Sequence, residues 1–231
     1  MPQHMSQAVQ DYVKAVYLET EVDEGGSEGS AATTAVAGRL GVSAASATNM
    51  LKRLDTLGLV DLVPYRGAEL TDAGRKVALE VIRHHRLLET YLAEALGVPW
   101  DEVHAEAEVL EHVLSERLED RIAERLGDPT SDPHGHPIPP RSGDVVSPER
   151  VPLAGLEAGS RAIVAEVSDR DPALLRYLGE AGLFPGALVR ATSVEPFEGP
   201  LTLEIGHSTR VLGREAASHV LVTPVTDKGV R

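Results

Sequence analysis

Two carboxylates and an imidazole stand close together in one short stretch of the chain. Glu108, Glu111 and His112 follow the acidic pair Asp101–Glu102, which suits the first turn of a helix. At 3.6 residues per turn, their spacing of i, i+3 and i+4 places all three on one helical face. Carboxylate oxygens and an imidazole nitrogen are ligands for hard or borderline divalent cations. The spacing therefore predicts a metal site, and His104, one turn before Glu108, is available to a second centre.

A second chelating pair precedes this stretch. Thr71–Asp72 caps a long predicted helix that runs to about Leu96, and His85 and Glu89 are i, i+4 neighbours on it. The residues 128–152 are rich in Pro, Gly and Ser and are interpreted as a linker. His134 and His136 lie in this linker; their spacing is compatible with a metal, but loop residues beside proline turns are the commoner explanation.

Composition limits the classes of function. The chain has 231 residues, 42% of them hydrophobic, which is enough for one large domain or two small ones. Cysteine is absent, so disulfides and thiolate sites are excluded. Neither a membrane-length apolar run nor a signal-peptide pattern is found, so we expect a cytoplasmic protein with no membrane partner. The net charge of −14 argues against bulk electrostatic binding of nucleic acid, so any DNA contact needs a locally basic surface.

The N-terminal third supplies such a surface. Residues 33–40 and 43–57 are predicted as two helices joined at Gly41, the helix-turn-helix pattern. Alternating residues 59–63 and 68–70 follow as a β-hairpin wing, for which an ordinary hairpin beside a helical core is the alternative. The second helix begins with small, polar residues, which suits its insertion into the major groove of DNA. The residues expected to contact DNA are Arg39, Ser43, Ala45, Ser46, Thr48, Asn49, Lys52, Arg53 and Arg66.

Taken together, the patterns predict a mainly α chain with a small β part. Residues 6–21 are expected to form a first amphipathic helix, and the short strands with Gly-containing turns after Leu153 suggest a small β-barrel. The domains are expected to be a winged helix-turn-helix (1–76), a helical metal-binding and dimerisation domain (77–140), a linker (141–151) and the β domain (152–231).

Several blocks of the chain resemble the diphtheria-toxin-repressor family of metal-dependent repressors. They are residues 11–17 (DYVKAVY), 82–89 (IRHHRLLE), 103–112 (VHAEAEVLEH) and 132–139 (DPHGHPIP). Residues 153–156, 175–178 and 182–186 resemble the SH3-like, FeoA-type domain that many members carry. The resemblance covers nearly the whole chain, and its HxExExxEH spacing is specific.

The resemblance implies two metal sites. A primary site falls on Asp11, Glu108, Glu111 and His112, and an ancillary site falls on His85, Glu89 and His104, with a further ligand at about Asp171. The iron branch has Met and Cys where this chain has Asp11 and Glu108, so the hard oxygen ligands indicate the manganese branch. One version of that branch has Glu where Lys14 stands, which favours separated primary and ancillary sites over a close-spaced binuclear one.

The function that follows is a Mn(II)-dependent repressor of metal-homeostasis genes that binds a double-stranded DNA operator as a homodimer. We do not expect it to be an enzyme. Dimer contacts are expected within residues 100–126, through Val109, Leu110, Val113 and Leu114. Two alternatives remain: an Fe(II)-dependent repressor of the same family, with other divalent transition metals also able to bind, and a di-metal hydrolase. The hydrolase is disfavoured because the sequence shows no candidate nucleophile and no Gly-rich substrate loop.

Overall fold

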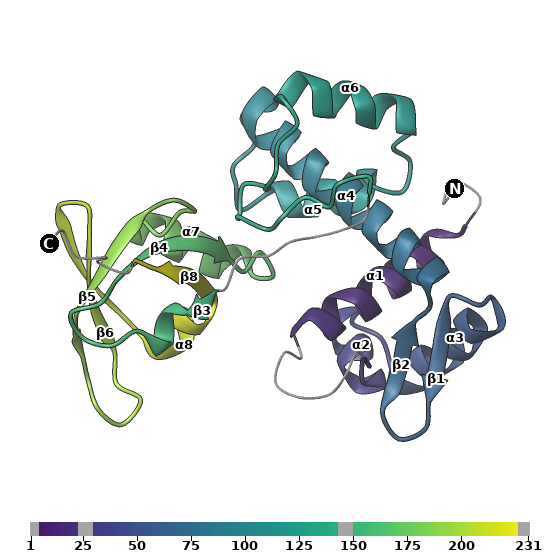
Figure 1. The fold of residues 1–231 in the computed structure, drawn as a ribbon, viewed down its shortest axis with the longest axis horizontal. Coiled ribbons are helices and arrows are strands. Elements are labelled where there is room, and N and C mark those ends of the chain that lie inside the picture. Colours follow the sequence, from purple (N-terminus) through teal and green to yellow (C-terminus); the bar gives the residue numbers. More distant parts are fainter. Residues whose placement is uncertain (1–4, 23–29, 143–149, 226–231) are drawn as a thin grey trace, which may run out of the picture. The chain divides into compact units, whose positions relative to one another are not determined.

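The computed structural model describes residues 5–22, 30–142 and 150–225 (Figure 1). The chain forms two compact units: one comprises Met1–His85, Glu108–Glu124 and Pro139–Asp144, and the other comprises Arg86–Ala107, Arg125–Ile138 and Val145–Arg231. The boundary falls inside one long helix, and the units are treated separately below. In the part of the chain that the structure describes, no helix is both long enough and apolar enough to cross a membrane.

The predicted winged helix-turn-helix is confirmed. Its elements in chain order are α1 (Gln7–Val22), α2 (Thr33–Arg39), α3 (Ala44–Thr56), β1 (Val60–Val63) and β2 (Gly67–Leu70). The oxygen of Ser43 caps α3 by accepting from the backbone N–H of Ser46, as its N-cap type predicts. Val36, Ala47, Leu51 and Leu54 are buried between the helices, whereas Leu57 is more than half exposed.

The helical segment differs from its prediction at one point that matters for the metal ligands. It consists of α4 (Asp72–Leu96), α5 (Val103–Leu110) and α6 (Glu116–Leu126). The spacing predicts Glu108, Glu111 and His112 on one helix, but α5 ends at Leu110, where the backbone N–H of Val113 bonds to the Leu110 carbonyl in a tight turn. The carbonyl of Glu111 accepts instead from His84 Nδ1 at 3.2 Å. Glu111 and His112 therefore lie in a turn after the helix.

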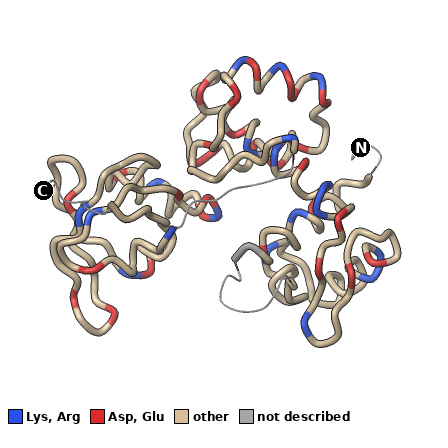
Figure 2. Tube along the Cα trace, in the orientation of Figure 1, with Lys and Arg blue, Asp and Glu red and all other residues tan. Residues whose placement is uncertain are grey.

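The α6 helix carries alternating charges. Basic and acidic positions follow one another along its length (Figure 2). One of these charged residues is not solvated, because Glu119 is 3% exposed and contacts Arg83 Nε at 2.5 Å. Glu119 is therefore a buried acid on a helix whose other charged residues are exposed.

The C-terminal part is a six-stranded antiparallel sheet in the order β3-β8-β4-β5-β6-β7. Its core contains large aliphatic side chains with no exposure, among them Leu175, Leu178, Leu201 and Leu203. Among the described residues the two edge strands are not paired with each other, so the expected SH3-like domain is an open sheet, not a closed barrel. Its elements are β3 (Val151–Pro152), η2 (Leu153–Gly155), β4 (Arg161–Val167), α7 (Pro172–Ala181), β5 (Leu188–Val194), β6 (Leu201–Ile205), β7 (Ser208–Leu212), α8 (Arg214–Ser218) and β8 (Val220–Pro224).

Candidate metal centres

The first centre gathers five predicted ligands from three segments, and all five lie in the first compact unit. We use this name for Asp11 on α1, His85 on α4, Glu108 on α5, and Glu111 and His112 in the turn that follows. His112 Nε2 lies 3.0 Å from Asp11 Oδ1, and His85 Nδ1 lies 2.5 Å from Glu111 Oε2. The resemblance assigns His85 to the ancillary site, and that assignment stays a prediction; in the structure the same side chain also contacts Glu111.

Lys14 enters this centre from the helical turn after Asp11. Its Nζ donates to Glu108 Oε1 at 2.7 Å and to Glu111 Oε2 at 2.8 Å. The same atom lies 3.2 Å from His85 Nδ1. Lys14 is 8% exposed and Glu111 is 1% exposed, so this ion pair is shielded from water. The sequence showed only that a lysine stands at this position, not that its charge lies among the ligands.

The charges of the first centre shift one another's pKa values. Burial raises the pKa of the Asp11 carboxyl, and the nearby carboxylates of Glu111 and Glu108 add to that effect against the opposing charge of His112. Burial lowers the pKa of Lys14, but Glu111 and Glu108 outweigh it and leave this pKa above its usual value. Burial would also raise the pKa of Glu111, yet bonds from His85 and Lys14 hold it below its ordinary value.

Two neighbouring side chains position the ligands of the first centre. His112 Nδ1 lies 2.6 Å from Gln10 Oε1, which leaves Nε2 on the side of Asp11. His84 holds the backbone of Glu111, and the other ring nitrogen of His84 lies 3.3 Å from Glu119. His84 itself is buried, with 5% of its surface exposed.

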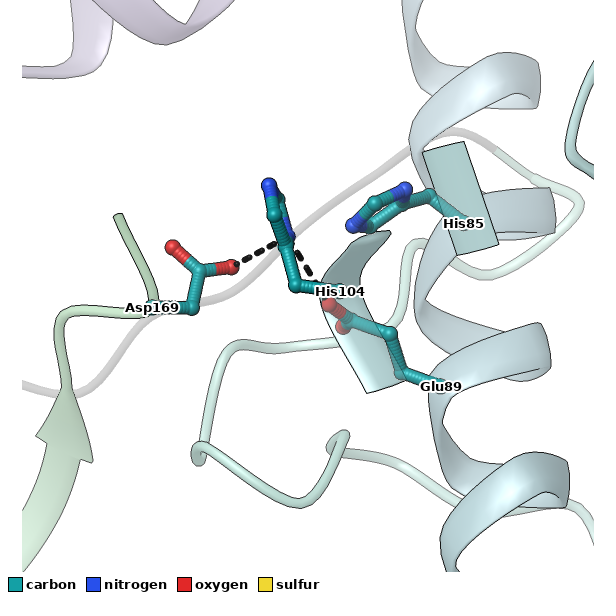
Figure 3. Close-up of side chains that lie close together, drawn as sticks. All are labelled: His85, Glu89, His104 and Asp169. Carbon is teal, nitrogen blue, oxygen red and sulfur yellow. Dashed lines mark hydrogen bonds and ion pairs between the residues drawn. The ribbon is translucent and has the colours of Figure 1, made fainter. Parts of the chain in front are cut away.

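The second centre lies in the second compact unit and has His104 in the middle. His104 Nδ1 lies 3.1 Å from Glu89 Oε1 and 3.2 Å from Asp169 Oδ2 (Figure 3). Glu89 has no exposed surface, and it follows His85 by one turn on α4. We use the name second centre for Glu89, His104 and Asp169, together with the loop described next.

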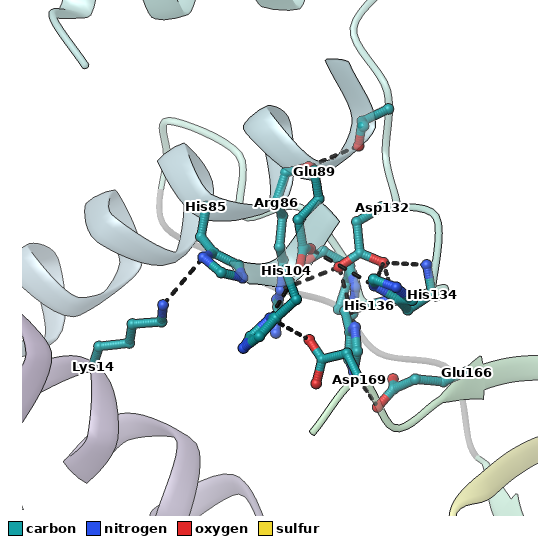
Figure 4. Close-up of polar contacts among 12 residues, drawn as sticks. Lys14, His85, Arg86, Glu89, His104, Asp132, His134, His136, Glu166 and Asp169 are labelled. Atoms are coloured by element: carbon teal, nitrogen blue, oxygen red, sulfur yellow. Dashed lines mark hydrogen bonds and ion pairs between the residues drawn. The ribbon is translucent and has the colours of Figure 1, made fainter. Parts of the chain in front are cut away.

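A buried loop completes the second centre and was missed by sequence reasoning. Asp132 accepts from the backbone N–H groups of His134 and His136, and Figure 4 shows these side chains grouped with Glu89 and Asp169. Asp132, His134 and His136 bring possible ligand atoms within 4.8 Å of one another. His134 Nε2 donates to the Trp100 carbonyl at 2.7 Å, so its Nδ1 faces the carboxylates.

A glycine lets this loop approach the C-terminal sheet. Gly135 has φ +90°, and a Cβ there would lie 2.0 Å from the carbonyl oxygen of Ala165. The next backbone contact is a hydrogen bond from Val167 N–H to the His134 carbonyl at 2.9 Å. The interpretation of residues 128–138 as linker is therefore wrong. The DPHGHP spacing was the signal for the site, but the Pro and Gly residues that fix the loop also imitate a linker composition.

Electrostatics hold the second centre in a charged state. Burial lowers the pKa of His104, but hydrogen bonds with Asp169 and Glu89 outweigh it and raise the pKa to about 10. Burial raises the pKa of Asp169, and the opposing effect of His136 and His104 leaves it well below its ordinary range. The His104 imidazole is therefore protonated at neutral pH, and a metal ligated by it would have to replace that proton.

Asp171, which the resemblance implies as a further metal ligand, caps a helix in the structure. Its Oδ1 accepts from the backbone N–H of Ala173 at 2.8 Å and caps α7. Asp169, two residues earlier, is the carboxylate beside His104.

The residues expected to contact DNA lie mainly on the exposed side of α3. Ser43, Ala45, Ser46, Thr48, Asn49, Lys52 and Arg53 are exposed, and Arg66 is exposed on the wing. Arg39 differs, because its Nε donates to Glu19 at 2.6 Å and its side chain is 18% exposed. The helix thus presents short polar side chains with two basic residues near its end.

The donor sets fit a divalent transition metal. Both centres consist of carboxylate oxygens and imidazole nitrogens, and the chain has no cysteine to add a soft thiolate. At the first centre, Asp11, Glu111 and His112 bring ligand atoms within 4.8 Å of one another. The fold and these sites together define a winged-helix DNA-binding protein that carries metal-ligand clusters.

Comparison with known proteins agrees with this class. Residues 4–68 match the iron dependent repressor N-terminal DNA binding domain, residues 71–140 match the metal binding and dimerisation domain, and residues 151–224 match the FeoA domain. The iron-dependent repressor IdeR of Mycobacterium tuberculosis is 35% identical over 202 residues, covering 82% of this chain and 87% of the relative. The transcriptional regulator MntR of Escherichia coli O6:H1 is 38% identical over 113 residues, covering 48% of this chain and 68% of the relative.

A solved structure described as a manganese-dependent transcriptional repressor in complex with manganese has a TM-score of 0.84 and 40% identity, covering 94% of this chain and all of that one. This chain belongs to the diphtheria-toxin-repressor family of metal-dependent transcriptional regulators. The resemblance and the fold class inferred from the sequence are confirmed.

Proposed function

We propose that this protein is a manganese(II)-activated repressor of metal-homeostasis genes, and that it binds its operator as a homodimer. The observation that carries this proposal is the first centre. It joins Asp11, on the first helix of the DNA-binding segment, to Glu111 and His112 beyond α5, using oxygen and nitrogen donors only.

Manganese is favoured by the chemistry of these donors. Hard carboxylate oxygens suit Mn²⁺, and the chain has no cysteine to supply the thiolate that favours later metals. Iron(II) is the second candidate, since a relative over most of the chain is named an iron-dependent repressor. A di-metal hydrolase finds no support, because the family consists of transcriptional regulators.

The residues of the first centre suggest how the signal reaches DNA. A divalent ion bound there supplies positive charge that several carboxylates share. Asp11 then holds α1, and with it the helix-turn-helix, in one fixed relation to the turn at Glu111 and His112. The favoured arrangement would set the distance between the two recognition helices of a dimer, roughly 34 Å for half-sites one turn of DNA apart. Metal binding therefore increases the fraction of protein molecules that adopt the DNA-binding arrangement.

The dimer contact is proposed on the surface around the end of α5. Val109, Val113 and Leu118 are 68%, 71% and 52% exposed, and Leu110 is 37% exposed. A patch of this kind on a folded chain marks an association surface. Leu114, which we had expected in the contact, is 5% exposed and packs in the chain's own core.

The second centre is proposed to tune metal affinity. Glu89 and His104 lie with Asp169 and the Asp132–His136 loop, so we propose Asp169 in place of Asp171 as the ligand from the C-terminal region. An ion bound by these groups would stabilise the C-terminal domain on the α4–α5 segment.

The test compares Asp11→Ala with Glu89→Ala in DNA mobility shifts on genomic fragments, with Mn²⁺, with Fe²⁺ and with a chelator. We expect Asp11→Ala to lose metal-dependent DNA binding and Glu89→Ala to need a higher metal concentration. Full Mn²⁺-dependent binding by a folded Asp11→Ala protein would contradict the proposal, and a response of the parent protein to Fe²⁺ alone would favour the second candidate.

A further inference from the structure

We propose that the ring of Tyr65, at the tip of the β1–β2 wing, packs against the deoxyribose rings of the DNA minor groove, beside the major groove that α3 enters. The inference rests on the proposed function, because it names a further contact with the same partner, double-stranded DNA. It assigns an apolar contact to the wing, in addition to the phosphate contact expected of Arg66.

Tyr65 has a backbone conformation that tyrosine rarely adopts. The backbone N–H of Arg66 donates to the Val63 carbonyl at 3.1 Å, so Pro64 and Tyr65 are the central residues of a tight turn. Tyr65 has φ +64°, at the position of the turn where glycine or asparagine is usual. Its side chain is fully exposed. The turn therefore presents a whole aromatic ring at the end of the wing.

The wing is anchored to the helix-turn-helix, which fixes the position of its tip. Ala31, just before α2, exchanges two backbone hydrogen bonds with Ala68 on β2, at 2.8 Å and 3.0 Å. Gly67 permits this close approach, because a Cβ there would lie 1.9 Å from the Ala31 carbonyl oxygen. The hairpin extends beyond α2 and α3 (Figure 1). A tip held in this way loses little conformational entropy when it binds a partner.

The charges of the hairpin restrict its contact with DNA to the tip. Asp61 and Glu69 face each other two residue pairs away from the pair nearest the turn. At about 3.3 Å per residue, these acids lie roughly 7 Å farther from the tip. Arg66 is exposed and directly follows Tyr65. The tip therefore combines a cation with an aromatic ring, while the acidic part of the hairpin stays away from the phosphates.

The minor groove is the part of DNA that suits this tip. Only three residues separate the end of α3 from the start of β1, so a wing beside a helix in the major groove reaches the neighbouring minor groove. Deoxyribose rings and phosphates line that groove. The sugars offer apolar surface to the tyrosine ring, and the phosphate oxygens accept from a guanidinium.

A second hairpin tip lacks the basic neighbour. Phe197, between β5 and β6, is also fully exposed and has φ +58°. It is flanked by Glu195 and Glu198, whose carboxylates would be repelled by phosphates. The two tips share exposure and backbone conformation and differ in the charge beside the ring, so only the tip with Tyr65 is suited to DNA.

The test replaces Tyr65 by Ala, which removes the ring, and by Phe, which keeps it. Both variants retain a Cβ, so the turn keeps its backbone preference. Phe197→Ala is the matched control, because it removes a fully exposed ring from the other hairpin tip. Binding is measured with Mn²⁺ at several salt concentrations, on the genomic fragment that the parent protein binds most tightly. Hydroxyl-radical footprinting of the same fragment reports which deoxyribose rings are protected.

We expect Tyr65→Ala to weaken binding roughly tenfold and to lose protection of the sugars beside the site of α3. Its salt slope should stay unchanged, because no charge is removed. Tyr65→Phe and Phe197→Ala should keep the affinity and the footprint of the parent protein.

A Tyr65→Ala protein with the affinity and footprint of the parent would overturn the inference. A fall of its salt slope by about 1, the effect expected for Arg66→Ala, would also overturn it, since the ring would then only hold the wing in place. A parent protein without metal-dependent DNA binding would overturn the proposed function together with this inference.

Discussion

The ring of His112 is oriented by Gln10, whose Oε1 lies 2.6 Å from Nδ1 of the imidazole. An amide oxygen only accepts, so the proton is on Nδ1. The lone pair of neutral His112 is therefore on Nε2, the atom that faces Asp11 at 3.0 Å. Gln10 thus selects the tautomer that a metal ligand needs, although it does not itself belong to the ligand cluster.

Replacing Gln10 by Leu should weaken metal binding without unfolding the protein. Partners that orient a ligating histidine typically contribute about 10-fold to 100-fold in affinity. The affinity is measured by competition with a metal-binding dye, and the ¹⁵N spectrum of His112 reports which nitrogen carries the proton. Gln10→Glu retains an acceptor and should keep both the affinity and the tautomer. Equal loss of affinity in the two variants would contradict the orienting role.

Substitutions of the two aspartates near the start of α7 should affect metal binding and helix capping separately. Asp169→Asn removes a carboxylate 3.2 Å from His104 and should weaken binding at the second centre by roughly tenfold or more. Asp171→Ala removes the cap of α7 and should cost about 1 kcal/mol of stability, with metal affinity unchanged. Isothermal titration and thermal unfolding of both variants distinguish the two effects; a metal defect confined to Asp171→Ala would reverse the assignment.

These aspartates illustrate what the sequence alone provides. Helix periodicity, caps and turn residues predicted the helices of the N-terminal half within one or two residues, because amphipathic spacing is local information. Asp169 and Asp171 have the same side chain two positions apart, and only the path of the chain after β4 decides which one points toward His104. The choice depends on tertiary contacts that no local pattern encodes.

The first centre shows the same limit. Spacing identified Glu108, Glu111 and His112, yet these residues do not share a continuous helix, since α5 ends at Leu110. Where the helix ends, the carbonyl of Glu111 is hydrogen-bonded by His84, which lies 27 residues earlier in the sequence. Gln10 looked like an ordinary residue of an amphipathic helix, and its role comes from a histidine about a hundred residues away.

Acid should destabilise the protein through Glu119 between about pH 4.5 and pH 2. Burial raises the pKa of this carboxyl, but contacts with His84, Arg83 and Arg141 outweigh it and lower the pKa from 4.5 to about 2. The contribution of ionised Glu119 to the free energy of unfolding is therefore complete above pH 4.5 and is lost as the pH falls toward 2. Its full size is about 3 kcal/mol. Glu119→Gln should reduce stability at neutral pH and flatten the dependence in that range. Glu124→Gln, at a 76% exposed side chain of the same helix, is the control and should change neither.

The two kinds of DNA contact should respond differently to substitution. Asn49 is exposed on α3, where its amide can reach a base edge, so Asn49→Ala should relax sequence preference. Arg66 is exposed on the wing, where a phosphate contact carries no sequence information. Arg66→Ala should weaken binding equally on all sequences and reduce the salt slope by about 1. Competition binding at several salt concentrations measures both effects, and an unchanged slope for Arg66→Ala would remove the wing from the interface.

Dimerisation should fail when a charge is placed on the patch after α5. Val113 is 71% exposed, and Val113→Asp would put a carboxylate into an apolar contact, where it has no partner. Val211, on the edge strand β7, is 63% exposed and gives a matched control, since Val211→Asp adds the same charge to a surface that we do not assign to the dimer. Sedimentation at micromolar concentration with Mn²⁺ should find Val113→Asp monomeric and Val211→Asp dimeric. If Val113→Asp remains a dimer while Val211→Asp dissociates, the contact lies on the C-terminal sheet instead.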